Sequence, residues 1–92
     1  MHISRHSDFT EHLFEILDYI AQDNFLASVH FLADLNDRIK YLIDFPYQYR
    51  RSIYFDDDMV RDMIFRGYTI IYEIDPKDEQ IEILDIFNRN KP

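Results

Sequence analysis

This chain contains no cysteine and only one glycine in 92 residues. Without cysteine it has neither a disulfide framework nor thiolate chemistry, which suits a reducing compartment. It carries no phosphate-binding loop, no Ser-His-Asp set and no dinucleotide fingerprint, so we expect no cofactor. No apolar run reaches the roughly 18 residues of a membrane span, and the N-terminal residues lack the apolar core of a signal peptide. We therefore expect a cytoplasmic protein without membrane association.

Basic residues are also few. Ten lysines and arginines stand against eighteen aspartates and glutamates, which gives a net charge of −8. This balance argues against general nucleic-acid binding, which requires clustered positive charge. Most of the basic residues lie from Arg50 onward, so the second half can present a local basic patch on an acidic body. The chain is rich in aromatic residues, with eight phenylalanines and seven tyrosines. We expect a partner protein to cover part of that apolar surface.

Two helices are expected in the first half of a single domain over residues 1–92. Asp8 followed by Glu11 is typical of a helix start, because the aspartate can cap the helix and the glutamate favours its positive end. Apolar residues then recur at three- and four-residue spacing. Asn24 can cap a second helix, in which the same spacing resumes. We predict helices over residues 8–22 and 24–43, joined as an antiparallel hairpin.

Short strands are expected at the N-terminus and in the last third of the chain. Gly67 suits a tight hairpin turn, because glycine adopts positive φ without steric cost, and Pro76 marks a second turn. The predicted strands span residues 2–6, 59–65, 68–75 and 80–87, and residues 44–58 form a connection. The fold class is therefore α+β, in the order β-α-α-β-β-β. It consists of an N-terminal strand and an antiparallel helical hairpin packed on an antiparallel sheet.

Several short segments in this order carry a resemblance to a known family. The segments are Asp18-Tyr19-Ile20-Ala21 with Asn24 and Ala27, residues 42–46 ending in Pro46, Val60-Arg61, residues 68–72, and residues 81–86. Together they resemble the RelE/ParE superfamily of bacterial toxins from type II toxin–antitoxin systems. The resemblance implies a cognate antitoxin as partner, whose C-terminal segment wraps the toxin. Operator binding would then come from the antitoxin and not from this chain alone.

Members of this superfamily act in two ways. RelE-like proteins cut mRNA on the ribosome, whereas ParE-like proteins poison DNA gyrase. In a nuclease, Arg61 would match the sheet arginine that stabilises charge on the phosphate. The last strand, however, is followed by Asn88 where a histidine or tyrosine would be expected, and asparagine cannot act as a general acid or base. The sequence favours the ParE-like branch, with a RelE-like endonuclease or an inactive, antitoxin-binding homologue as alternatives.

The candidate target contacts are basic and polar residues of the second half, and the ParE-like resemblance implies that the C-terminal tail touches the target. They are Arg50, Arg51, Arg61, Arg66, Asn88, Arg89 and Lys91. Each arginine also has a structural interpretation: Arg61 can pair with Asp62 or with a carboxylate of a neighbouring strand, and Arg50 and Arg51 can be a solvated pair in a loop.

Other conspicuous side chains have structural explanations. Tyr68 and Tyr72 are expected to pack against the core, since they share one face of a strand with isoleucines. Three consecutive aspartates at 56–58 cannot all converge on one cation, so a solvated loop is expected there. His2, His6 and His12 lack the second paired spacing that would close a tetrahedral zinc site. No metal site is expected.

Overall fold

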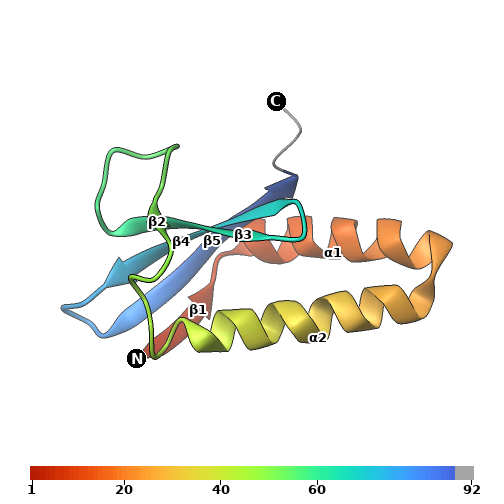
Figure 1. The fold of residues 1–92 in the computed structure, drawn as a ribbon, viewed down its shortest axis with the longest axis horizontal. Coiled ribbons are helices and arrows are strands. Elements are labelled where there is room, and N and C mark those ends of the chain that lie inside the picture. The colour runs from red at the N-terminus through yellow and green to blue at the C-terminus, as the bar shows by residue number, and fades with distance from the viewer. Residues whose placement is uncertain (89–92) are drawn as a thin grey trace.

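The computed structural model describes residues 1–88 and has the expected α+β architecture (Figure 1). Two antiparallel helices, α1 (Ser7–Asp23) and α2 (Phe25–Tyr41), pack on one face of a five-stranded sheet. The strands are β1 (His2–Arg5), β2 (Arg50–Arg51), β3 (Val60–Phe65), β4 (Tyr68–Asp75) and β5 (Gln80–Asn88), and their order across the sheet is β1-β5-β4-β3-β2. Within residues 1–88, no helix is long and apolar enough to cross a membrane.

Both helices begin at side-chain caps. The His6 Nδ1 accepts a hydrogen bond from the Asp8 N–H at 3.0 Å, and the Asn24 Oδ1 accepts one from the Ala27 N–H at 3.1 Å. The prediction that Asp8 caps α1 is therefore wrong: Asp8 lies in the first turn, where its charge still suits the positive end of the helix. The second helix was expected over residues 24–43, but it ends at Tyr41, where the chain enters a series of turns.

The sheet is mixed and not purely antiparallel, which corrects the expected topology. β3, β4 and β5 form the predicted antiparallel meander, but β1 pairs with β5 in parallel. No hairpin ties β1 to its neighbour, since both helices intervene, and a crossover of that length permits the parallel direction. The expected strand at 2–6 is β1, which ends at Arg5. The connection 44–58 contains the short edge strand β2, paired with β3.

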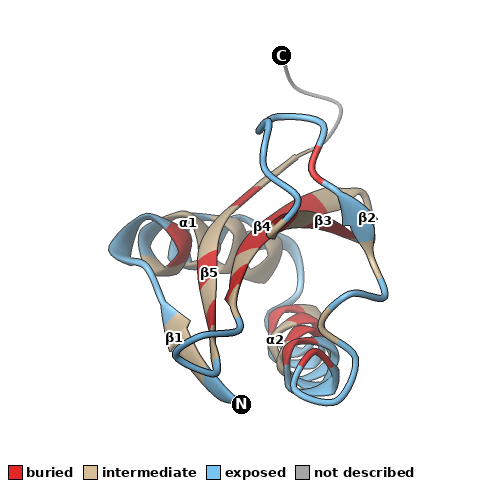
Figure 2. Ribbon diagram, turned by 90° about the vertical axis from the view of Figure 1, so that its left-hand side faces the viewer, coloured by how far each residue is buried: buried red, intermediate tan, exposed pale blue. Residues whose placement is uncertain are grey.

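The core lies between the helical hairpin and the sheet, where the buried segments of Figure 2 face one another. Tyr72 is 0% exposed, and its hydroxyl donates to the Pro46 carbonyl at 2.7 Å. Tyr68 packs against the same core and meets the Phe31 ring edge-on, with ring centroids 5.5 Å apart. The prediction that both tyrosines pack against the core is confirmed.

A β-bulge in β5 changes which side chains face the helices. Ile71 pairs with Asp85 and Tyr72 pairs with Ile83, so Leu84 is an additional residue in β5. Pairing between β1 and β5 ends at Ile83, immediately before the bulge. Beyond that point α1 runs along β5, and the Asp85 side chain reaches His12 on α1.

Candidate functional site

Arg61 holds the connection that precedes β3. Its Nε donates to the Asp58 carbonyl at 3.0 Å and its Nη1 donates to the Tyr49 carbonyl at 3.1 Å. The guanidinium also lies over the Tyr47 ring, 5.2 Å from the centroid. The expected pairing of Arg61 with Asp62 does not occur, because Asp62 points to the other face of the sheet and pairs with Arg50. Arg61 therefore stabilises a loop through backbone acceptors.

Arg50 compensates a buried carboxylate. Its Nη2 lies 3.3 Å from the Asp62 Oδ2, and the Asp62 side chain is 0% exposed. The same oxygen accepts a hydrogen bond from the Ile53 N–H at 3.1 Å, which fixes the loop after β2. A buried carboxylate without such partners would be strongly destabilising. Arg50 thus has a structural role, although its own side chain is about half exposed.

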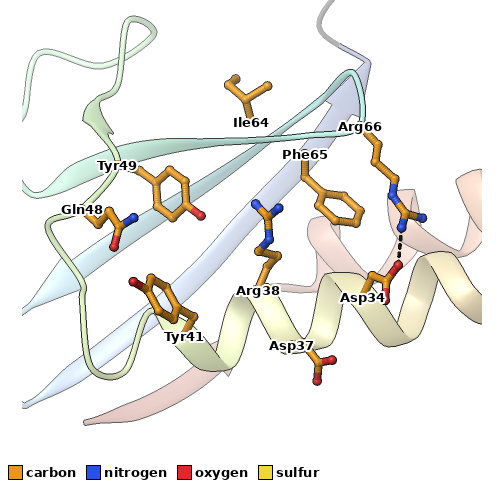
Figure 3. Close-up of a pocket in the computed structure, with 9 residues that line it drawn as sticks. All are labelled: Asp34, Asp37, Arg38, Tyr41, Gln48, Tyr49, Ile64, Phe65 and Arg66. Carbon is orange, nitrogen blue, oxygen red and sulfur yellow. Dashed lines mark hydrogen bonds and ion pairs between the residues drawn. The ribbon is translucent and has the colours of Figure 1, made fainter.

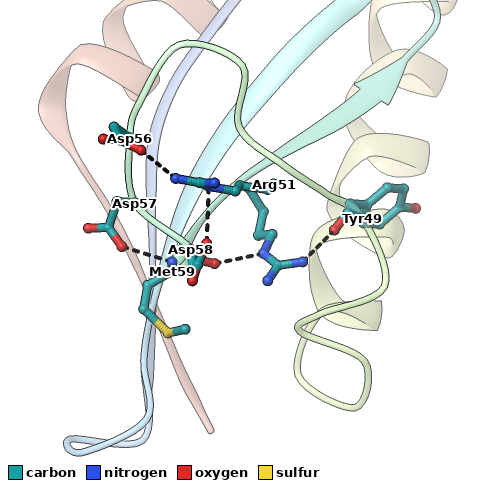
Figure 4. A network of polar contacts seen from close by, with 7 residues as sticks. Tyr49, Arg51, Asp56, Asp57, Asp58 and Met59 are labelled. Carbon is teal, nitrogen blue, oxygen red and sulfur yellow. Dashed lines mark hydrogen bonds and ion pairs between the residues drawn. The ribbon is translucent and has the colours of Figure 1, made fainter.

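Arg51 forms ion pairs with the aspartate loop (Figure 4). Its Nη2 lies 2.5 Å from Asp56 and its Nε lies 3.1 Å from Asp58. Asp57 accepts a hydrogen bond from the Met59 N–H at 2.8 Å. The three aspartates were expected to be solvated, and they are exposed, but each also holds the loop together. Because Arg51 lies directly opposite Arg61 in the sheet, the nearby carboxylates also offset the repulsion between the two cations.

Arg66 lies at the opposite end of β3 from Arg61, roughly 17 Å away along the strand. It forms an ion pair with Asp34 on α2 and lies over the Phe65 ring, 5.1 Å from the centroid. The structure therefore gathers Arg50, Arg51 and Arg61 at one end of β3 and separates Arg66 from them.

A cleft of about 550 Å³ opens beside Arg66, between α2, β3 and the start of the connection. Figure 3 shows the Arg38 guanidinium rising from α2 between the rings of Tyr49 and Phe65, while Asp37 points away. Arg38 lies 5.7 Å from the Phe65 centroid, and among residues 1–88 it has no carboxylate partner. Sequence reasoning missed this cation, because its position in the helical pattern does not distinguish it from an ordinary surface arginine.

A second cleft, of about 480 Å³, lies between α1, the start of β4 and the end of β5. In it, the His12 Nδ1 and the Asp85 Oδ1 are joined by a hydrogen bond of 2.6 Å. This bond, together with the charges of Asp85, Glu15 and Asp8, raises the pKa of His12 above its usual value, although partial burial opposes the shift. Sequence reasoning considered His12 only as a zinc ligand and missed the pair, because 73 residues separate its members.

The remaining predicted contacts lie at the C-terminus. Asn88 ends β5 and lines the second cleft. Arg89 and Lys91 lie outside the described residues. The described candidates thus lie at two ends of the sheet. Arg50, Arg51 and Arg61 lie where β3 begins, and Arg66 and Asn88 lie where β3 and β5 end. Of these residues, Asn88 alone lines the cleft beside α1.

The described residues offer limited chemistry near Arg61. Burial raises the pKa of the Tyr72 hydroxyl well above its usual range, and that hydroxyl is already bonded to Pro46. Tyr72 is therefore a poor proton donor or acceptor near neutral pH. No group of three histidine, aspartate or glutamate residues within 1–88 is arranged to hold a metal ion.

The chain was also compared with known proteins. The model of the family described as "ParE toxin of type II toxin-antitoxin system, parDE" matches residues 3–91. A search among curated proteins gave no match. The family match spans nearly the whole chain, including both helices, the strands β2 to β5 and all of β1 except His2.

Proposed function

Because the chain belongs to the ParE toxin family of type II toxin–antitoxin systems, we propose that it arrests bacterial growth by poisoning DNA gyrase and is neutralised by its cognate antitoxin. The family match over residues 3–91 is the observation that carries this proposal. Such a mechanism places the protein in the cytoplasm, where gyrase acts.

The surroundings of Arg61 support a poison that binds its target over a nuclease. Cleavage of RNA through the 2′-OH requires a proton acceptor and a proton donor beside the cation that stabilises the phosphate. Among the described residues, the Arg61 guanidinium donates to two backbone carbonyls and lies over a phenol ring. Those contacts give Arg61 a structural role in β3 that requires no catalytic function.

The proposal is tested by controlled expression of the full chain in a bacterium, with DNA damage, cell length and mRNA integrity followed in parallel. We expect filamentation, a DNA-damage response and intact mRNA. Purified chain added to gyrase and supercoiled DNA should trap the cleaved DNA–gyrase complex, and an equimolar amount of the antitoxin should prevent this. Rapid, translation-dependent mRNA cleavage would instead support the RelE-like alternative. Growth without arrest would support an inactive homologue that only binds antitoxin.

The polar tail is proposed to contact the target. Residues 89–92 follow the last strand, so their deletion should leave the melting curve unchanged and lower toxicity. A chain with Lys77→Gln is the control for loss of positive charge outside the tail: it loses one such charge in an exposed turn, whereas the deletion removes two. If the shortened chain is as toxic as the parent and as stable, the tail does not contact the target.

A further inference from the structure

Helix α1 concentrates negative charge. It carries five carboxylates, on Asp8, Glu11, Glu15, Asp18 and Asp23, and it has no lysine or arginine. Two of its aromatic side chains are exposed as well: Phe14 is 62% and Tyr19 is 72% exposed. A helix surface of this composition is complementary to a partner that presents positive charge together with apolar area.

The cleft beside α1 lies within this acidic surface. Its polar lining comes from His12, Glu15 and Tyr19 on α1 and from Tyr68, Asp85 and Asn88 on the sheet. His12, Glu15 and Tyr19 are three and four residues apart, so they follow one another along the same side of the helix. Among the described residues, Glu15 has no ion-pair partner.

The hydrogen bond between His12 and Asp85 fixes the orientation of the imidazole ring and of the carboxylate in this cleft. The Asp85 Oδ1 accepts from both His12 and the Ile86 N–H, the latter at 2.8 Å. Because the imidazole uses its Nδ1 for this bond, its Nε2 points away from Asp85. The carboxylates of Glu15 and Asp85 give the cleft two negative charges, and a proton on His12 would offset one of them.

We propose that this cleft binds an arginine side chain presented by the antitoxin. The inference rests on the proposed function only for the identity of the partner. A guanidinium matches the lining because it can pair with the Glu15 carboxylate while its flat face lies on a tyrosine ring. An anion would be repelled by Glu15 and Asp85. The chain's net charge of −8 adds a long-range attraction for a basic segment.

A proton on His12 should weaken this binding. The titratable groups that face His12 are Asp8, Glu15 and Tyr19 from α1, Tyr68 from β4, and Asp85 from β5. The hydrogen bond to Asp85 raises the pKa of His12 above its usual value, and His12 gains a proton as pH falls through that raised pKa. The cleft then loses one negative charge, so the affinity for a cation rises with pH.

The first experiment measures the affinity of the purified full chain for the antitoxin of the same module by calorimetry at pH 6 and pH 8. Glu15→Gln should weaken binding about fivefold at pH 8, which is typical of one partly exposed ion pair. Glu11→Gln removes the same charge from the same helix outside the cleft, so at physiological salt, where charges outside the cleft are screened, it should change the affinity less than twofold. Replacement of the responsible arginine in the antitoxin by glutamine should cause no further loss in the Glu15→Gln chain.

The inference is overturned if Glu15→Gln and Glu11→Gln behave alike, or if the affinity of the parent chain does not rise from pH 6 to pH 8. It is also overturned if the effect of Glu15→Gln disappears in a chain lacking residues 89–92, because the cleft would then hold the chain's own Arg89. Antitoxin that does not bind the parent chain at all would contradict the proposed function. In that case N-acetyl-arginine methylamide is the probe, followed through the NMR signals of His12. A shift in those signals that is lost in Glu15→Gln supports a guanidinium site, and no shift overturns it.

Discussion

Replacement of Arg61 by methionine separates a structural role for this arginine from a role at the target. The substitution keeps an unbranched apolar stem and removes the guanidinium. It therefore removes the hydrogen bonds to the Asp58 and Tyr49 carbonyls and the contact with the Tyr47 ring. The loop before β3 loses the attachment that Arg61 provides but keeps those of Arg51 and Asp62, and the core behind it is unchanged.

The size of the effect follows from those contacts. Each hydrogen bond contributes about 1 kcal/mol net, because both lie near the surface. The cation–π contact contributes about 0.5 kcal/mol at such a site. The two side chains lose similar rotamer freedom on folding, so entropy changes little. Arg61→Met should thus lower the free energy of unfolding by about 2.5 kcal/mol, or the melting temperature by about 10–20 °C for a domain of this size.

Thermal and urea unfolding followed by circular dichroism measure this difference. The dependence of the free energy on urea concentration should not change, because the surface exposed on unfolding stays the same. Lys77→Met is the matched control: it removes one positive charge in an exposed turn and should melt within about 2 °C of the parent. The reasoning fails if Arg61→Met is as stable as that control. A folded Arg61→Met chain that has lost toxicity would assign the arginine to the target or to a nuclease site.

Three further predictions concern the turn, the core and the acidic cleft. Gly67→Ala should lower the free energy of unfolding in urea by about 1 kcal/mol, because Gly67 has a φ of +84°, which strains any residue with a Cβ. No neighbouring atom obstructs the added Cβ, so backbone strain is the whole cost, and a clearly smaller loss would contradict it. Tyr72→Phe should cost about 1–2 kcal/mol by removing the donor from the half-buried Pro46 carbonyl. The exposed Tyr19→Phe, the control in the same assay, should cost almost nothing. His12→Asn should flatten the dependence of stability on pH: the raised pKa of His12 means that its contribution is complete below about pH 6.5 and is lost as pH rises through the folded-state value. Thermal melts from pH 5.5 to 8.5 measure it, and equal slopes in parent and variant would refute it.

The local elements of this protein were determined by local chemistry. Gly67, with Arg66 at φ of 49° beside it, forms the tight turn that the single glycine predicted. Asn24 caps the second helix as predicted, since a cap acts within three residues of the helix start. Of the apolar residues that recur at helical spacing, Phe9 and Leu35 are buried in the core, whereas Phe25 and Val29 are exposed.

Only the tertiary structure decided the direction of β1, the bulge at Leu84 and the partners of the charged side chains. A strand that no hairpin ties to its neighbour can pair in either direction. A bulge is defined by the register with the partner strand, so it could not be located in the sequence of β5 alone. Arg61 binds backbone carbonyls, which no sequence pattern marks. His12 meets Asp85 because α1 runs along β5 beyond the end of β1. The sequence by itself therefore determined both helices, four of the five strands and the family resemblance, whereas β2 and the contacts between residues distant in the chain required the packed fold.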